Sequence, residues 1–404
     1  MASWLKDQAR PLSTAEVGVP DGDLDAFGEA VGSAHLVGLG EATHGSHEFQ
    51  TMKHRLLQYL VEKKGFRSFI MEANMANCLP IQDYVMNGTG DARQVVAGQI
   101  RFTCVSDEVV AMVQWIRAWN QSHVDPADKV WYMGMDMNDT RQCFPAIQAY
   151  VQPLDGPLAA QLGEWFKEFK AQTASLDMDA YAKIPAPDRA RMRGQLQQAH
   201  DALAARRADF IARSSPFAFE QTLRLVKVLL QEESMYSVPS SENFPIRDSA
   251  MMENTQWCMA QRGPGTRAVV WAHDFHVSRS PACMGEALGL AMGTDYRALG
   301  FSFYQGGLAA VGPTGLGPWS ALPLTVKSYE AGFHQIKVPI FFLNLRSDSS
   351  GAGPTWLKGP LWKREVGALW SPSDPDEAAV LTPLTQAYDM LIHIDTVTAS
   401  HYYR

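Results

Sequence analysis

Glycines, a carboxylate and two imidazoles follow one strongly apolar stretch of this chain. The segment GLGEATHGSHEF, residues 38–49, places Glu41 three residues before His44 and His47 three residues after it. An imidazole titrates near neutral pH, and a neighbouring carboxylate can orient it, so the spacing suits a general base. Alternatively, Glu41 only favours the start of the following helix, and the glycines let the backbone turn sharply where the strand ends.

Comparable polar groups follow three other apolar segments. Glu72 lies near the end of FIMEAN, Asp136 ends YMGMD, and His273, Asp274 and His276 follow AVVW in a second H-x-x-H pair. If these strands are parallel, their carboxyl ends meet at one sheet edge, where ligands bind in open α/β folds. A polar group of this size is costly to bury without a purpose. We therefore predict a functional site there. Other histidines, including His401, show no local pattern and are interpreted as structural.

The elements that would position these groups alternate along the chain. Apolar runs predict strands at 34–40, 67–74, 129–136, 267–277, 296–307, 338–345 and 390–397, and helical periodicity appears at 48–65 and 107–121. This rhythm predicts an α/β fold whose mostly parallel central sheet is flanked by helices. Residues 140–262 carry helical patterns only. We expect a catalytic core formed by residues 1–139 and 263–404, and a helical insertion that acts as lid and substrate wall.

Composition limits the classes of function. The chain has 404 residues and a net charge of −8, which argues against a nucleic-acid partner. No run of 18 apolar residues predicts a membrane span, and the N-terminus has no signal-like apolar stretch. Five cysteines without C-x-x-C spacing fit a reducing compartment. The expectation is a soluble, cytoplasmic protein.

Several catalytic motifs are missing from the sequence. There is no G-x-S-x-G and no H-E-x-x-H, and Thr43 stands where the third glycine of G-x-G-x-x-G would be. A serine nucleophile and a dinucleotide cofactor are therefore not expected. No cofactor is predicted, but the two H-x-x-H pairs with nearby carboxylates leave a bound metal such as zinc open.

The motifs together resemble the erythromycin esterase family. The resemblance rests on GLGEATHGSHEFQTMKHRL, FIMEAN, MGMD, RDSAMMENTQW, VVWAHDFHV, ALGFSFYQG and AYDMLIHIDTV, which occur in this order from about residue 30 to 398. It implies a hydrolase that opens a macrolide lactone without a serine or cysteine nucleophile. It also implies an α/β core whose helical insertion covers the active-site cleft.

The resemblance also implies roles for particular residues. His44 corresponds to the general base and Glu41 to the acid beside it, while Glu72 and His273 correspond to a second carboxylate and a second essential imidazole. Lys53 stands where some macrolide-active members have arginine. Further residues are expected to contact the small ester or lactone substrate, namely His47, Arg55, Asp136, Arg247, Asp274 and His276.

Two points stay open from the sequence. Asp274 replaces the asparagine usual in the family, which adds a negative charge beside His273. The chemistry is expected to be ester hydrolysis by a histidine-activated water. The alternatives are a metal-dependent hydrolase that uses the histidine and glutamate cluster, or a biosynthetic lactone-forming or acyl-transfer enzyme on the same scaffold.

Overall fold

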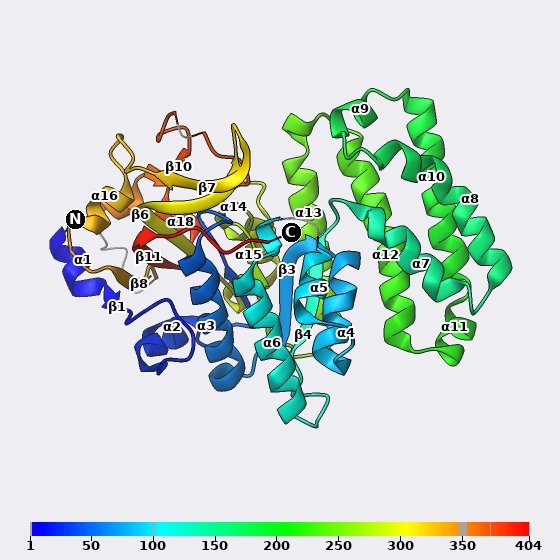
Figure 1. Cartoon of the computed structure of the whole chain (residues 1–404), viewed down its shortest axis with the longest axis horizontal. Helices are drawn as coiled ribbons and strands as arrows, with labels where there is room; N and C mark the ends of the chain where they lie inside the picture. Colours follow the sequence, from blue (N-terminus) through cyan, green and yellow to red (C-terminus); the bar gives the residue numbers. More distant parts are fainter. Residues whose placement is uncertain (1, 100–101, 347–353, 372, 404) are drawn as a thin grey trace. The chain divides into compact units, whose positions relative to one another are not determined.

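The computed structural model describes residues 2–99, 102–346, 354–371 and 373–403 (Figure 1). The chain forms two compact units. The sheet unit contains Met1–Glu72, Pro80–Tyr132 and Arg262–Arg404, and the helical unit contains Ala73–Leu79 and Met133–Gln261. The helical unit thus begins seven residues earlier than the expected insertion at 140–262, and it includes a short segment after residue 72.

A central sheet forms the core of the sheet unit. Its strands lie in the order β1 (Arg10–Pro11), β8 (Ile340–Asn344), β11 (Met390–Val397), β6 (Tyr296–Gly312), β2 (Leu36–Leu39), β5 (Ala268–Trp271), β3 (Ser68–Asn74) and β4 (Trp131–Asp136). The neighbouring pairs β11–β6, β6–β2, β2–β5 and β5–β3 are parallel. Strand β8 runs antiparallel to β1 and β11. The prediction of a mostly parallel α/β sheet is confirmed.

Local sequence explains the two helices that matter most for the site. Helix α3 (His47–Lys64) begins after Ser46, whose hydroxyl accepts a hydrogen bond from the amide of Phe49, and ends at Gly65 with φ of 72°. Helix α6 (Asp107–Ser122) begins after Ser106 in the same way. The serines that cap both helix starts and the glycine that ends α3 are the residues usually found at these positions. The sheet unit also contains α1 (Ala2–Gln8), α2 (Asp25–Val31), α5 (Ala92–Ala97), α14 (Asp274–Val277), α15 (Met284–Met292), α16 (Tyr329–His334), α17 (Thr355–Lys358) and α18 (Leu384–Ala387), and α4 (Leu79–Asn87) lies almost entirely in it.

Three local predictions differ from the structure. The strand expected at 267–277 ends at Trp271, because the His273 imidazole accepts the Phe275 amide and starts helix α14. Strand β6 continues past residue 307 to Gly312 and forms an antiparallel hairpin with β7 (Gly315–Ala321). A further pair, β9 (Leu361–Arg364) and β10 (Ala379–Thr382), was not predicted. The apolar runs in these segments are short, at 308–311 and 378–381, and glycines or charged residues interrupt their surroundings.

The helical unit contains the helices predicted for residues 140–262. They are α7 (Cys143–Val151), α8 (Gly156–Thr173), α9 (Met178–Ala182), α10 (Ala186–Ala204), α11 (Arg207–Arg213), α12 (Pro216–Tyr236) and α13 (Phe244–Gln261). Helix α10 packs against α8 and α12, and α12 also packs against α7 and α13 (Figure 1). Met235 is 1% exposed and so belongs to the interior of this unit. The lid function of the insertion stays a prediction.

Among the described residues, no helix is both long and apolar enough to cross a membrane.

Candidate active site

The strongest candidates lie at the carboxyl ends of three neighbouring parallel strands. Glu41 and His44 follow β2, Glu72 lies in the last half of β3, and His273 comes two residues after the end of β5. Because β5 lies between β2 and β3, these side chains meet at one edge of the sheet. This is the edge at which open α/β folds bind ligands.

Two glycines bring the loop after β2 close to its neighbours. A Cβ atom added at Gly40 would lie 2.0 Å from Oδ1 of Asp274, and one at Gly45 would lie 1.9 Å from the carbonyl oxygen of Ala309. Neither residue has a positive φ angle. The glycines are thus needed for close approach of the backbone to neighbouring atoms.

Glu41 joins an imidazole and an ammonium group in a buried position. Its Oε1 lies 2.6 Å from Nδ1 of His44, and its Oε2 lies 2.5 Å from Nζ of Lys53. The indole of Trp271 also donates to Oε2 at 3.1 Å. Burial raises the pKa of Glu41, but Lys53 and His44 together lower it below its usual value. Glu41 is therefore ionised, and Ser46 rather than Glu41 caps helix α3.

His44 presents its Nδ1 nitrogen to Glu41 and its Nε2 nitrogen to the other side of the ring. Hydrogen bonding to an ionised carboxylate requires the proton on Nδ1, so the neutral ring has its lone pair on Nε2. The side chain is 14% exposed. The amide of Gln50 donates to the backbone carbonyl of His44 at 2.9 Å and holds this loop against helix α3.

His273 lies next to His44 but is held in a different state. The centres of the two rings are 5.0 Å apart. The Phe275 amide donates to Nδ1 of His273, so Nε2 carries the proton and donates to the carbonyl of Val366 at 3.1 Å. Burial, with a smaller contribution from His44, lowers the pKa of His273 to about 4. The ring is neutral at pH 7.

Glu72 supports the segment that carries His273. Its Oε2 accepts the His273 amide at 2.8 Å, and its Oε1 lies 3.3 Å from Nε2 of His276. Both side chains are largely buried. These contacts tie strand β3 to the first turn of helix α14 and bring Glu72 and His276 into the same group as His273.

The negative charge of Asp274 is balanced by a cation that the sequence did not indicate. Nζ of Lys363 lies 2.6 Å from Oδ2 of Asp274, and both side chains are fully buried. The Phe301 amide donates to Oδ1 at 3.0 Å. Burial raises the pKa of Asp274 to about 6, and Lys363 opposes that rise. Asp274 therefore packs beneath the loop, against Gly40, as part of its support.

A cavity lies beside this group of side chains. Its volume is about 290 Å³, and its walls are Glu365, Val366, Gly367, Leu369, Trp370, Ser371, Glu377 and Ala378. Val366 joins the cavity to the site, because its amide donates to the carbonyl of Ala42 at 2.7 Å and its carbonyl accepts from His273. A small ligand in this cavity would lie next to the loop that carries His44.

Four of the expected residues lie in other groups. His47 contacts Glu108 and Glu16. The guanidinium of Arg55 pairs with Asp23 at 2.5 Å and donates to carbonyls of the segment that precedes helix α2. Asp136 and Arg247 form an ion pair of 2.7 Å within the helical unit. Substrate contacts for these residues remain predictions.

Sequence reasoning missed several groups at the site. Trp271, Lys363 and Val366 contact its side chains directly. Trp271 is the last residue of β5 and the first of the WAH motif, which was the one signal that pointed to it, while Lys363 and Val366 lie in a segment without a motif.

The fold is an α/β fold with a buried histidine–glutamate pair at the carboxyl ends of its parallel strands. This arrangement is typical of enzymes that use a general base. The family model described as "Erythromycin esterase" matches residues 61–397. The chain belongs to the erythromycin esterase family, which places it among hydrolytic esterases that act on small molecules. The match begins after Glu41, His44 and Lys53, so the roles of these residues rest on geometry.

Curated relatives agree with this assignment. The chain is 22% identical over 343 residues to erythromycin esterase type II of Escherichia coli, which covers 77% of this chain and 78% of the relative. It is 20% identical to erythromycin esterase type I of the same organism, covering 69% of this chain and 72% of the relative. A putative hydrolase of Bacillus subtilis is 19% identical, over 68% of this chain and 63% of that protein.

Solved structures share the fold along nearly the whole chain. A Bacillus cereus protein has a TM-score of 0.86 at 28% identity, with 100% of this chain and 98% of that chain covered. A succinoglycan biosynthesis protein has a TM-score of 0.84 at 23% identity, covering 99% and 97%. A mutant of the erythromycin esterase EreC in its open conformation has a TM-score of 0.71 at 16% identity, covering 98% of each chain.

Proposed function

We propose that the protein hydrolyses an ester or macrolactone bond by means of a water molecule that His44 activates. The observation that carries the proposal is the 2.6 Å contact between Nδ1 of His44 and the buried Glu41 carboxylate. This contact leaves Nε2 as the proton acceptor on a partly exposed ring. Family membership supports the ester bond as the target.

In the first step, the water oxygen attacks the carbonyl carbon of the ester while one of its protons moves to Nε2 of His44. The resulting imidazolium is stabilised by Glu41, as carboxylates stabilise imidazolium in other hydrolases. The attack opens the carbonyl π bond and leaves a negative oxygen on a tetrahedral intermediate. His273 is the proposed donor to that oxygen: its Nε2–H, which donates to the Val366 carbonyl at the cavity wall, would exchange this acceptor for the oxyanion.

In the second step, the tetrahedral intermediate collapses and the bond to the alcohol oxygen breaks. His44 returns its proton to the leaving oxygen, so the products are an acid and an alcohol, which remain in one molecule when the substrate is a lactone. The neutral state of His273 suits a hydrogen-bond donor better than a proton source. His44 alone then handles the proton in both steps.

Lys53 acts through Glu41 in this proposal. Its ammonium is fully buried, contacts the glutamate oxygen that faces away from His44, and lies 4.1 Å from the centre of the Trp271 ring. This placement favours a positioning residue that keeps Glu41 ionised over a donor to the oxyanion. Glu72 and His276 similarly position the segment of His273.

The substrate is proposed to be a bulky, largely apolar ester. Leu369 and Trp370 line the cavity, and Leu369 is 73% exposed, so an apolar ligand would cover surface that now faces solvent. Two relatives are named erythromycin esterases, which favours macrolactones as the first class to test. The helical insertion is proposed to act as the lid.

Two other reactions remain as alternatives within the proposal. A metal-dependent hydrolysis would use the histidine and glutamate cluster, whereas the proposed mechanism needs no metal or cofactor. A biosynthetic acyl transfer would replace water by an alcohol or amine, and the similarity to a succinoglycan biosynthesis protein motivates that test.

The experiment that tests the function is incubation with a panel of macrolactones and simple esters, followed by mass spectrometry. Hydrolysis of a lactone adds one water to its mass. The expected result is this gain with the wild-type protein and no gain with His44→Asn. A product joined to an added acyl acceptor would favour the biosynthetic alternative, and activity lost with a chelator and regained with a metal would favour the metal-dependent one.

A further inference from the structure

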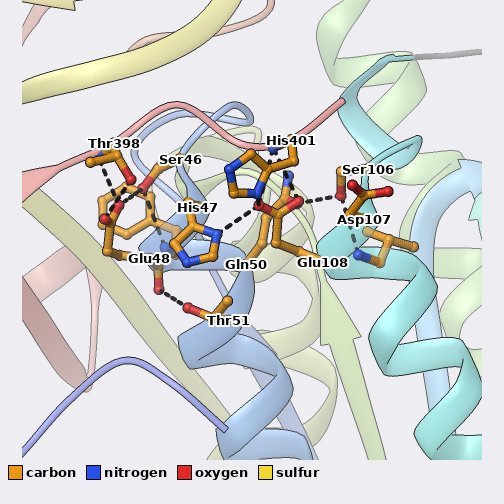
Figure 2. Close-up of polar contacts among 12 residues, drawn as sticks. Ser46, His47, Glu48, Gln50, Thr51, Ser106, Asp107, Glu108, Thr398 and His401 are labelled. Atoms are coloured by element: carbon orange, nitrogen blue, oxygen red, sulfur yellow. Dashed lines mark hydrogen bonds and ion pairs between the residues drawn. The ribbon is translucent and has the colours of Figure 1, made fainter. Parts of the chain in front are cut away.

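A second group of histidines includes His47, which lies three residues after His44 in the chain. His47 begins helix α3, Glu108 lies in the first turn of α6, and His401 belongs to the C-terminal segment (Figure 2). Nδ1 of His47 is 2.7 Å from Oε1 of Glu108, and Nδ1 of His401 is 3.0 Å from the same oxygen. Two imidazole nitrogens from distant segments therefore meet at one carboxylate oxygen of a third segment.

The spacing of these atoms suits a small divalent cation. The two nitrogens and the carboxylate oxygen all lie within 4.8 Å of one another. In a tetrahedral zinc site, bonds of about 2.0–2.2 Å place the ligand atoms roughly 3.3 Å apart. Both nitrogens, at 2.7 Å and 3.0 Å from the Glu108 oxygen, would move outward to reach this spacing. The side chains of His401 and His47 are 66% and 21% exposed, while Glu108 is only 3% exposed and stays fixed.

Glu16 supplies the outer contact that metal-binding histidines usually have. Its Oε1 lies 3.0 Å from Nε2 of His47. With a carboxylate on the far nitrogen to keep one proton there, a metal would displace the proton that Nδ1 shares with Glu108, which gives the usual carboxylate–histidine–metal arrangement. Two imidazoles and one carboxylate are ligands that zinc accepts, with a fourth position left for water.

We propose that His47, Glu108 and His401 form a zinc-class metal site that is separate from the catalytic group. The site holds the C-terminal segment across the starts of α3 and α6. Backbone bridges already join Ser46 to Ala399 and Ser106 to Tyr402 on either side of it. A bound ion between these two bridges would attach the C-terminal segment to α3 and α6 more strongly, next to the loop that carries His44.

The test measures zinc content and thermal stability of the full-length protein. Chelator-treated protein is returned to chelator-free buffer at pH 8, because protons compete with the metal for imidazole nitrogens. Zinc is added, the excess is removed by gel filtration, and bound zinc is counted. We expect about one zinc per chain and a rise in Tm of several degrees.

Three variants separate this site from other histidines. His401→Ala removes an exposed ring, and the backbone amide of residue 401 still reaches Glu108. This variant and His47→Gln should each lose most of the zinc and the rise in Tm. The matched control is His35→Ala, whose exposed ring also pairs with a carboxylate, at 3.3 Å from Asp295, and it should bind zinc as wild type does.

Several results would overturn the site. These are a wild-type chain without stoichiometric zinc, a His401→Ala variant that keeps its zinc, or loss of zinc in His44→Asn, which would place the ion at the catalytic group. If His47→Gln fails to fold, His401→Ala decides alone. The readout does not depend on activity, so failure here leaves the proposed hydrolysis untouched, and failure of hydrolysis leaves the metal site standing.

Discussion

His44 and His47 stand three residues apart, and each presents Nδ1 to a buried glutamate, but their second neighbours differ. Glu41, the partner of His44, is balanced on its other oxygen by Lys53. The other nitrogen of His47 meets a second carboxylate, Glu16, and the glutamate contacts raise the pKa of His47 to about 9. An imidazole already protonated at pH 7 cannot take a proton from water. The comparison therefore favours His44 over His47 as the proton acceptor in the proposed mechanism.

The largest expected effect separates these two histidines directly. His44→Asn should lower kcat/KM by about 10²–10⁴-fold, the usual contribution of a general base. His47→Asn should lower it by less than about tenfold, because that ring does not contact the proposed reacting atoms. Steady-state kinetics on any ester that the wild type hydrolyses provides the measurement, with Tm as the check on folding. Equal losses of kcat/KM in the two variants would contradict the assignment of proton transfer to His44 alone.

A second test removes the cation that distinguishes the Glu41 pair. Lys53→Met leaves Glu41 buried and unbalanced, and breaking such a pair costs roughly 3–5 kcal/mol of stability. Urea unfolding should show this loss, and kcat should also fall because the pKa of Glu41 rises. Lys53→Arg restores the charge and should recover most of both quantities. Recovery of stability without activity would mean that Lys53 has a further role.

The third test uses the buried, neutral state of His273. Its pKa is lowered to about 4 from the usual 6.5, so the unfolded chain binds more protons between these values. Stability should therefore fall as pH drops from about 6.5 to about 4, by roughly 3 kcal/mol for a shift of this size. His273→Asn should flatten that part of the pH profile. An unchanged slope of unfolding free energy in the variant would show that folding does not lower the pKa of His273.

The smallest expected effect concerns the packing of the loop that carries His44. Gly45→Ala pushes a methyl group into the backbone of Ala309 and should cost about 1–3 kcal/mol of stability. Gly194→Ala in helix α10 meets no atom within 4 Å and should add about 0.5–1 kcal/mol instead. Thermal unfolding of both variants measures the difference. A neutral Gly45→Ala would mean that this loop moves readily.

Sequence patterns indicated much of the fold because the central strands are short, buried and apolar. They also placed His44, Glu41, Glu72 and His273 at one sheet edge, since parallel strands bring their carboxyl ends together. The extension of β6 and the β9–β10 pair escaped prediction. The β6 extension pairs with the glycine-rich β7, and β10 pairs with β9, where Lys363 and Arg364 follow only two apolar residues, so neither pair has a clear apolar pattern on both strands.

The rest of the site depends on contacts between distant segments. Lys363 balances Asp274 from 89 residues away, and His401 reaches Glu108 across 293 residues. Single-sequence reasoning has no pattern that links such pairs. It also placed both histidines of the first H-x-x-H pair in one predicted site, whereas His44 contacts Glu41 and His47 contacts Glu108 and Glu16. The H-x-x-H spacing thus gave no indication that His44 and His47 lie in different environments.

A single turnover in water labelled with oxygen-18 tests the central claim most directly. Enzyme in excess over a hydrolysable lactone or ester should give an acid product that carries one labelled oxygen, and the mass of the protein should not change. That result is expected if His44 activates a water that attacks the ester. An unlabelled product with label on a glutamate of the protein, or an acyl group attached to the chain, would contradict the account, because a side chain would then be the nucleophile.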